Sequence, residues 1–214
     1  MKIIPSIASA PQLELGCQLS RIAEIPYVHI DIEDGNFLPN ITFGMKTVRE
    51  IAGCCKAELD VHLLATNPIK YVQELSELNI SAVCGHLEAL TYPLEFLNKV
   101  RSLGMRAGLG LNLRLPVAAL KSYAGAFDYL ILMTSEPDGC GQMFAETAPE
   151  RIREARASLP EDVMICADGG IGPRELKMVM EAGADCAVMG RAVWGAECPV
   201  RAWKEMEAWR RGEM

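Results

Sequence analysis

The three histidines of the chain all stand in short apolar runs that are typical of β-strands. These runs end in His29-Ile30-Asp31, Asp60-Val61-His62 and His86-Leu87-Glu88. Residues two apart on a strand share a face, so each histidine is predicted to point the same way as a carboxylate. Polar groups of this kind are costly to bury without partners. We therefore predict that the strands are neighbours and that their ends converge on a metal ion or a substrate.

A fourth apolar run, Val163–Ala167, leads into Asp168 and two glycines. Two imidazoles and two carboxylates at such strand ends match a four-ligand site for one divalent metal ion. This mixture of ligands suits Zn, Fe, Mn or Co and does not discriminate among them. Such an ion could polarise a ketone and stabilise an enediolate. Taken singly, a histidine on a strand is more often a hydrogen-bonded structural residue, and an aspartate before glycines more often caps a turn. Because these residues are predicted at the same end of neighbouring strands, a common functional site is favoured.

Short apolar runs alternate with segments of helical periodicity along the chain. Strands are predicted at Ile3–Ile7, Val28–Ile32, Ala57–Leu63, Ala82–His86, Arg106–Leu111, Tyr129–Met133, Val163–Ala167 and Cys186–Met189. Helices are predicted at about residues 12–23, 45–53, 68–78, 94–103, 116–124, 148–159, 173–182 and 199–211. Proline marks most of the helix starts and glycine several of the ends.

Strands that alternate with helices indicate right-handed βαβ units and a parallel sheet. Eight such units predict an α/β fold, a (β/α)8 TIM barrel that forms one catalytic domain over residues 1–214. A doubly wound open sheet is the alternative. It would usually carry a glycine-rich turn after its first strand, where this chain has Pro5-Ser6-Ile7-Ala8-Ser9-Ala10.

The active site of such a barrel lies at the carboxyl ends of its strands. The residues predicted at this rim are Ser6, His29, Asp31, His62, His86, Glu88, Asn112, Met133, Asp168 and Gly190. Asp31 and Asp168 fall on the second and seventh strands, so they would flank a substrate from opposite sides. A carboxylate on each face is what the inversion of a C–H centre requires, because one removes the proton and the other returns one.

Glycine-rich segments after the last strands suggest a phosphate site. They are Pro137-Asp138-Gly139-Cys140-Gly141-Gln142, Gly169-Gly170 and Gly190-Arg191. Phosphate sites of these barrels commonly use the loops after strands 7 and 8, and glycine lets backbone N–H groups approach the oxygens. Arg191 is interpreted as a phosphate clamp or, equally, as a solvated residue at a helix start. We predict substrate contacts at Ser6, His62, Asn112, Gly139, Cys140, Gly141, Gly169, Gly170, Gly190 and Arg191.

Composition excludes several classes of protein. The formal net charge is −7, which argues against a nucleic-acid partner. No apolar run approaches the roughly 20 residues that span a membrane, and the N-terminus lacks the layout of a signal peptide. The eight cysteines contain no C-x-x-C pair. They are interpreted as reduced thiols of a cytoplasmic protein.

The chain resembles the ribulose-phosphate 3-epimerase family over nearly its whole length. The segments that carry the resemblance are Pro5–Ala10, Val28–Asn40, Leu59–Leu63, His86–Ala89, Leu111-Asn112, Met133–Pro137 and Asp168–Gly170. By this resemblance His29, Asp31, His62 and Asp168 would be the metal ligands, and Asp31 and Asp168 also the two catalytic acid/bases. Ser6 and His62 would contact the substrate. The resemblance also implies the barrel, one divalent ion and a homo-oligomer, a dimer or a hexamer.

Several positions depart from the family. Glu33 stands where the family usually has Met, Asn36 where it has His, and Pro11 where it has an acid. Asp138-Gly139-Cys140-Gly141 replaces Gly-Phe-Gly-Gly, and Arg191 replaces a small hydroxyl residue. In Ile41–Thr47 and Met133–Gly139 the chain looks most like a divergent branch of sugar-phosphate epimerases whose substrate is unsettled. The chemistry motif is intact while the specificity positions differ.

We therefore predict an isomerase of pentose phosphate metabolism, a metal-dependent epimerase that inverts C3 of a ketose phosphate through an enediolate. D-ribulose 5-phosphate to D-xylulose 5-phosphate is the default reaction. A hexulose 6-phosphate such as allulose 6-phosphate is the second enzyme hypothesis, and a non-catalytic sugar-phosphate-binding barrel is the third. A related barrel decarboxylase is disfavoured, because its chemistry places a Lys where this chain has Asp31-Ile32-Glu33.

Overall fold

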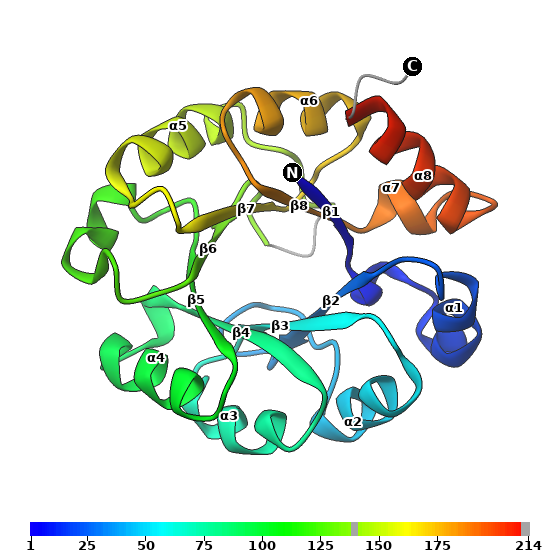
Figure 1. The fold of residues 1–214 in the computed structure, drawn as a ribbon, viewed down its shortest axis with the longest axis horizontal. Coiled ribbons are helices and arrows are strands. Elements are labelled where there is room, and N and C mark those ends of the chain that lie inside the picture. The colour runs from blue at the N-terminus through cyan, green and yellow to red at the C-terminus, as the bar shows by residue number, and fades with distance from the viewer. Residues whose placement is uncertain (138–140, 211–214) are drawn as a thin grey trace.

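The strands of the chain close into a parallel barrel surrounded by helices (Figure 1). The structure, a computed structural model, describes residues 1–137 and 141–210. Its strands are β1 (Lys2–Pro5), β2 (Tyr27–Glu33), β3 (Glu58–Leu64), β4 (Ile80–His86), β5 (Arg106–Leu111), β6 (Tyr129–Met133), β7 (Met164–Asp168) and β8 (Cys186–Met189). The sheet order is β1-β8-β7-β6-β5-β4-β3-β2, and a parallel bridge between Ser6 and His29 joins the two ends. The predicted (β/α)8 barrel is confirmed.

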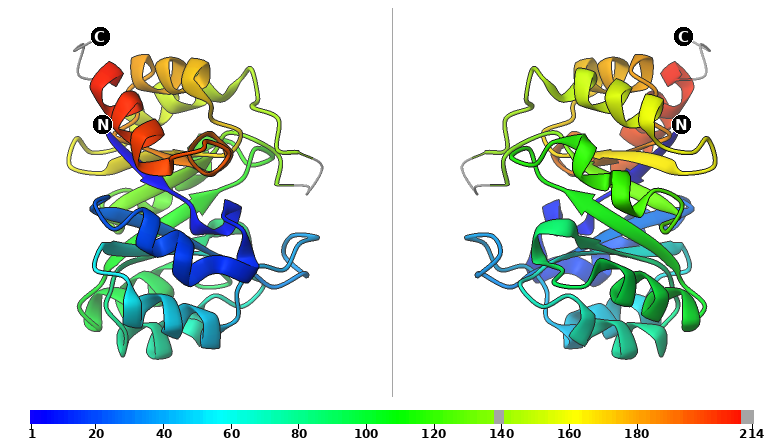
Figure 2. Two further views of the ribbon diagram at one scale, coloured as in Figure 1. Left: turned by 90° about the vertical axis from the view of Figure 1, so that its right-hand side faces the viewer. Right: turned by 90° about the vertical axis from the view of Figure 1, so that its left-hand side faces the viewer.

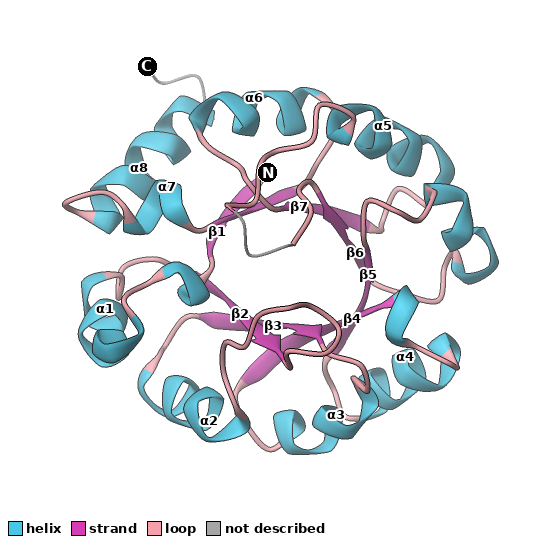
Figure 3. Cartoon of the chain, turned by 180° about the vertical axis from the view of Figure 1, so that it is seen from behind, coloured by secondary structure: helices cyan, strands magenta, loops and turns pink. Residues whose placement is uncertain are grey.

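The α-helices form the outer layer of the barrel (Figure 3). They are α1 (Leu15–Arg21), α2 (Met45–Cys54), α3 (Ile69–Ser76), α4 (Pro93–Ser102), α5 (Ala148–Ser158), α6 (Pro173–Glu181), α7 (Arg191–Trp194) and α8 (Pro199–Arg210). Short 3₁₀ helices are η1 (Ile7–Ser9), η2 (Gln12–Glu14), η3 (Leu87–Ala89) and η4 (Val117–Tyr123). No helix of the described residues is both long enough and apolar enough to span a bilayer.

Two helical elements differ from the sequence prediction. The segment after β5 is the 3₁₀ helix η4, whose two buried side chains are Val117 and Leu120. A spacing of three matches the 3₁₀ repeat, so this short segment packs both residues without an α-helical turn. One interpretation placed Arg191 at a helix start, but the helix α7 was not among the predicted helical segments. It has a single turn, which is too short to produce a periodic apolar pattern, and it buries Val193 and Trp194.

The apolar core has two parts. The larger part lies between the strands and the helices, and the smaller fills the barrel below the carboxyl ends of the strands. The members of the smaller cluster are Ile4, Ala82, Cys84, Tyr129, Ile131, Met133, Cys166, Cys186 and Val188. All seven cysteines of the described residues are free, and three of them serve here as small apolar side chains.

The loops that follow the strands gather at one end of the barrel. Two of them, the β2–α2 loop and the β6–α5 loop, project beyond the barrel on the same side (Figure 2). The first strand is shorter than predicted, because the chain turns into η1 after Ser6. This turn leaves Ser6 at the same end as the last residues of β2 and β7.

Candidate active site

Four side chains from three strands meet at the carboxyl end of the barrel. His29 and Asp31 come from β2, His62 from β3 and Asp168 from β7, and one ligating atom of each lies within 4.8 Å of all the others. The register of β2 and β3 pairs Asp31 with His62 directly. Asp31 Oδ1 lies 3.1 Å from His29 Nε2 and 3.4 Å from His62 Nδ1, and Asp168 Oδ2 lies 3.3 Å from His62 Nδ1. The predicted convergence is therefore present.

The cluster attracts positive charge. Burial lowers the pKa of His29, but Asp60 and Asp31 raise it by more, so the pKa lies well above its ordinary value. The pKa of His62 is raised in the same way, against its burial, by Asp168 and Asp31. Burial raises the pKa of Asp31, yet the adjacent His29 holds it far below its usual range. Asp31 therefore stays ionised beside two imidazoles whose side chains have no exposure to water.

The donor set fits one divalent metal ion. Among the described residues, His62 Nδ1 is buried and has no hydrogen-bond partner, although two carboxylates lie beside it. A buried polar atom without a partner is costly, and a cation between the four groups would use its lone pair. Two nitrogens and two carboxylate oxygens suit Zn, Fe, Mn or Co alike.

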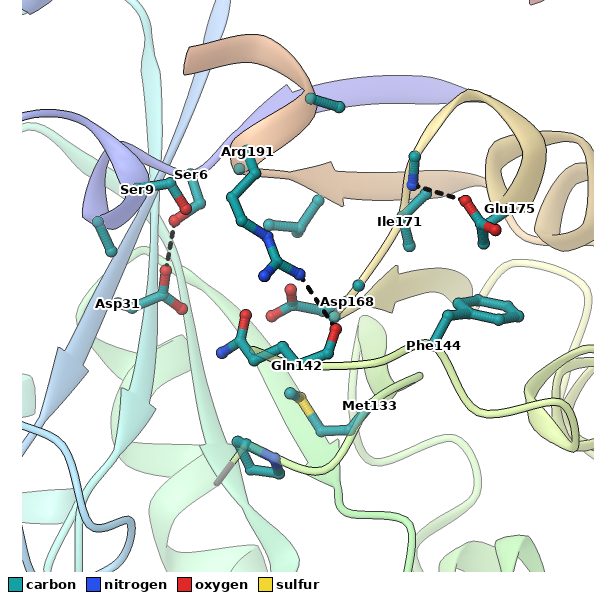
Figure 4. A pocket seen from close by; sticks show the side chains of 18 of the residues that line it. Ser6, Ser9, Asp31, Met133, Gln142, Phe144, Asp168, Ile171, Glu175 and Arg191 are labelled. Atoms are coloured by element: carbon teal, nitrogen blue, oxygen red, sulfur yellow. Dashed lines mark hydrogen bonds between the residues drawn. The ribbon is translucent and has the colours of Figure 1, made fainter. Parts of the chain in front are cut away.

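A cavity of about 840 Å³ opens above this cluster. It falls within the size range of small-molecule sites, about 300–1,000 Å³. Eight of the predicted rim and substrate residues line it: Ser6, Asp31, Met133, Asp168, Gly169, Gly170, Gly190 and Arg191. Figure 4 shows Ser6 and Asp31 on one side of this space, with Ser6 Oγ donating a hydrogen bond of 2.6 Å to Asp31 Oδ2. The structure therefore brings most of the predicted site together.

Other predicted residues lie elsewhere. Within the described part of the chain, the cavity wall does not include Asn112, whose backbone N–H donates to Glu88 at 2.9 Å and whose carbonyl accepts from Arg151 at 3.0 Å. His86 and Glu88 lie behind His62, away from the cavity. Burial lowers the pKa of His86 to about 4. Gly141 has a φ of +112° and adjoins the wall at Gln142. Asp138, Gly139 and Cys140 lie outside the described residues.

The predicted site residues left out several polar side chains of the cavity wall, among them Gln142 and also Glu33, which the sequence had marked only as a departure from the family. Glu33 lines the cavity with 8% exposure, and Asn40 Nδ2 donates a hydrogen bond of 2.6 Å to its Oε2. Burial and the neighbouring Asp31 raise the pKa of Glu33 to about 7. Glu33 follows Asp31 by two positions on β2, so the strand period already indicated their common face. Gln142 was marked only as the last residue of the predicted glycine-rich phosphate segment, and it lines the cavity from that loop.

Arg191 reaches over the cavity rather than away from it. Its Nη2 donates a hydrogen bond of 3.1 Å to the backbone carbonyl of Gln142, and Figure 4 shows this bond among the residues that line the cavity. The residue begins α7, as the solvated alternative expected, and it is exposed. Its guanidinium nevertheless connects the loop after β8 with the loop after β6.

Comparisons with known proteins identify one family. The family model described as "Ribulose-phosphate 3 epimerase family" matches residues 2–194. Ribulose-phosphate 3-epimerase of Mycobacterium leprae is 30% identical over 200 residues, covering 92% of this chain and 89% of the relative. The cytoplasmic isoform from Oryza sativa is 33% identical over 204 residues, with the same coverage. The Bacillus subtilis enzyme is 31% identical over 201 residues, covering 91% of this chain and 93% of the relative.

The solved structures share the fold alone. Orotidine 5'-phosphate decarboxylase from Pyrococcus horikoshii has a TM-score of 0.72 at 17% identity, covering 98% of this chain and 99% of that one. A mutant tryptophan synthase α-subunit from Pyrococcus furiosus also has a TM-score of 0.72, at 14% identity, covering 99% and 98%. Barrels of this kind support many reactions, so the function has to be argued from the site.

Proposed function

The chain belongs to the ribulose-phosphate 3-epimerase family, and from this premise we propose that it is a metal-dependent epimerase inverting C3 of a ketose phosphate. The proposed default reaction converts D-ribulose 5-phosphate to D-xylulose 5-phosphate. The observation that carries the proposal is the pair Asp31 and Asp168, which approach one centre from β2 and β7 beside two buried imidazoles. We further propose that residues 1–214 act as one catalytic domain, in the cytoplasm and as a homo-oligomer.

His29, Asp31, His62 and Asp168 would hold the ion. When bound, a divalent ion supplies positive charge that stabilises negative charge on the ketone and hydroxyl oxygens of the substrate. Asp31 Oδ1 and Asp168 Oδ2 are the oxygens that contact the imidazoles. Asp31 Oδ2 and Asp168 Oδ1 are therefore available for proton transfer.

The two carboxylates divide the proton transfer between the two faces of C3. One, as its carboxylate, accepts the C3 proton, which leaves an enediolate, and the other, as its carboxylic acid, donates its proton to the opposite face. Each such contribution is typically ~10²–10⁴-fold in rate. Ser6 Oγ donates to Asp31 Oδ2, so it orients that oxygen and stabilises its charged form.

The phosphate would lie at the opposite end of the cavity, against the loops after β7 and β8. Gly169 and Gly170 have φ angles of +117° and +68°, a region that favours glycine. A Cβ at Gly170 would lie 2.5 Å from the carbonyl oxygen of Gln142, so the two loops approach as closely as backbone allows. Without side chains at Gly169 and Gly170, backbone groups would face the phosphate end of a substrate, and the guanidinium of Arg191 would lie over the same end of the cavity.

Replacing Arg191 tests the phosphate end. We expect Arg191→Ser to raise KM for the phosphorylated ketose by about 10- to 150-fold, the equivalent of one charge-assisted hydrogen bond of ~1.5–3 kcal/mol, with a smaller effect on kcat. Steady-state kinetics with both parameters resolved measure this. Arg153→Ser, an exposed arginine of α5, is the matched control. An unchanged KM for every phosphorylated ketose would leave phosphate binding to the glycine loops alone.

A substrate panel tests the function itself. Ketose 5- and 6-phosphates are offered to protein loaded with one defined metal, and C3 inversion is followed by proton NMR. We expect turnover of D-ribulose 5-phosphate. A hexulose 6-phosphate such as allulose 6-phosphate is the second candidate, because the Glu33 carboxylate adds a hydrogen-bond acceptor to the cavity wall. Binding without turnover of any ketose would instead support the sugar-phosphate-binding barrel.

A further inference from the structure

A line of buried polar groups runs away from the cluster behind His62. His62 Nε2 lies 2.8 Å from His86 Nε2, and His86 Nδ1 lies 3.4 Å from Glu88 Oε2. Glu88 Oε1 accepts a hydrogen bond of 2.9 Å from the backbone N–H of Asn112. The side chains of His86 and Glu88 are 0% and 2% exposed. These buried polar side chains therefore form one continuous series of contacts, from His62 through His86 and Glu88 to the backbone of Asn112.

The two imidazole rings meet end to end. Their planes differ by 19° and their centroids are 4.9 Å apart. The two Nε2 atoms are only 2.8 Å apart, and the centroids are farther apart by about two ring radii. The two nitrogens therefore lie between the ring centres, as expected for a hydrogen bond in the plane of both rings. Such a bond contains one proton, so one nitrogen donates and the other accepts.

The carboxylate at the end of the line decides which nitrogen donates. Glu88 accepts from the Asn112 N–H at one oxygen, and an ionised carboxylate can only accept at the other. His86 Nδ1 therefore carries a hydrogen, and a neutral His86 leaves its Nε2 as an acceptor. The proton between the rings then belongs to His62 Nε2. In the neutral ring of His62, Nδ1 then has no hydrogen, and it faces Asp31 and Asp168.

We propose that His86 and Glu88 are positioning residues that hold His62 in the tautomer whose Nδ1 lone pair binds a divalent metal ion. The inference rests on the metal site of the proposed function. His29 shows the same arrangement through a shorter line, because its Nδ1 lies 2.7 Å from Asp60 Oδ1 and its Nε2 faces Asp31. The two imidazoles thus present opposite nitrogens to one centre, Nε2 from His29 and Nδ1 from His62.

The packing around His86 supports a placed ring. Gly110 lies opposite His86 in the β4–β5 register, and a Cβ there would come within 2.7 Å of His86 Cδ2. The ring of Phe37 covers His86, with centroids 5.1 Å apart. Arg151 holds the far end of the line, donating to the carbonyls of Asn112 and Leu115 at 3.0 and 2.9 Å. Outer partners of this kind fix ring orientation and tautomer in metal sites.

The test uses the whole protein with Zn²⁺ as the probe. The chain has three histidines, so ¹⁵N labelling of histidine resolves each ring in two-bond ¹H–¹⁵N spectra. In the zinc-bound wild type we expect hydrogens on His62 Nε2, His86 Nδ1 and His29 Nδ1. A hydrogen on His62 Nδ1, with zinc at Nε2, would overturn the proposal, and this measurement needs no variant.

Variants measure how much the line contributes. Glu88→Gln keeps the shape of the side chain, but its NH₂ group would face either His86 Nδ1 or the backbone N–H of Asn112, both of which donate hydrogen bonds. His86→Phe removes the nitrogen that accepts the hydrogen bond from His62 Nε2. We expect each to weaken Zn²⁺ binding about 10- to 100-fold in chelator competition, the range reported for outer partners of metal ligands. Trp203→Phe is the control, because it removes a partly buried hydrogen bond to Ile3 on the outer side of β1. It should bind Zn²⁺ as the wild type does.

The possible failures are distinguishable. Unchanged zinc affinity in folded Glu88→Gln and His86→Phe would overturn the positioning role and leave the metal site standing. A wild type that binds neither Zn²⁺ nor another divalent ion would overturn the metal site, and the positioning role with it. If both variants fail to fold, the tautomer of His62 in the zinc-bound wild type decides the question by itself.

Discussion

Asp31→Asn and Asp168→Asn should each abolish epimerisation, with a loss in kcat of at least ~10²–10⁴-fold per carboxylate removed. An amide keeps the shape and an oxygen for the metal, but it cannot accept the C3 proton. Both residues line the cavity and come from β2 and β7, so neither can take over the face served by the other. Steady-state turnover of both epimers, with metal content measured in parallel, checks this.

Proton exchange separates the two faces. In deuterated water each variant keeps one carboxylate, and we expect it to exchange the C3 proton only of the epimer that this carboxylate faces. The two variants should therefore retain exchange with opposite epimers. Asp162→Asn, an exposed aspartate remote from the cavity, is the matched control. Turnover like that of the wild type in either site variant would end the two-base hypothesis.

His29→Ala and His62→Ala are expected to lose bound metal and nearly all activity while the barrel remains folded. Each removes one of four converging ligands. The loss of metal affinity should exceed the about 10- to 100-fold typical of an outer partner, since the ligand itself is gone. Metal analysis after dialysis, kinetics and circular dichroism measure the three properties.

The fold is expected to survive because the apolar core between the strands and helices does not depend on these imidazoles. Lys56→Ala, an exchange at a position far from the cluster in the α2–β3 connection, should keep both metal and activity. The metal hypothesis predicts in addition that wild-type protein stripped with a chelator is inactive and recovers with added metal. Full activity of the metal-stripped protein would contradict the metal hypothesis.

Local sequence patterns determined most of the fold and the location of the site. Each predicted strand overlaps an observed one, and β5, β6 and β8 have the predicted bounds. The strand period of two placed Asp31 and His29 on a common face, because alternation along a strand is a local property. The same rule covers Glu33, which the predicted site residues did not include although it was marked as a departure from the family. The segment after β5 was predicted as a helix and is the 3₁₀ helix η4, whereas α7 was missed because its four residues are too few to show a helical period.

Only the tertiary structure decided how the polar groups pair. His29 lies opposite Asp60 and Asp31 opposite His62 through the register of β2 and β3, which joins residues about 30 positions apart. The period of a single strand gives the face of a side chain but not its neighbour across the sheet. That neighbour depends on register and on barrel closure between Ser6 and His29. These contacts decide which imidazole nitrogen faces the cluster. The ring nitrogen on the far side carries the hydrogen and donates it to an outer acceptor, which leaves the other nitrogen free to bind a metal ion.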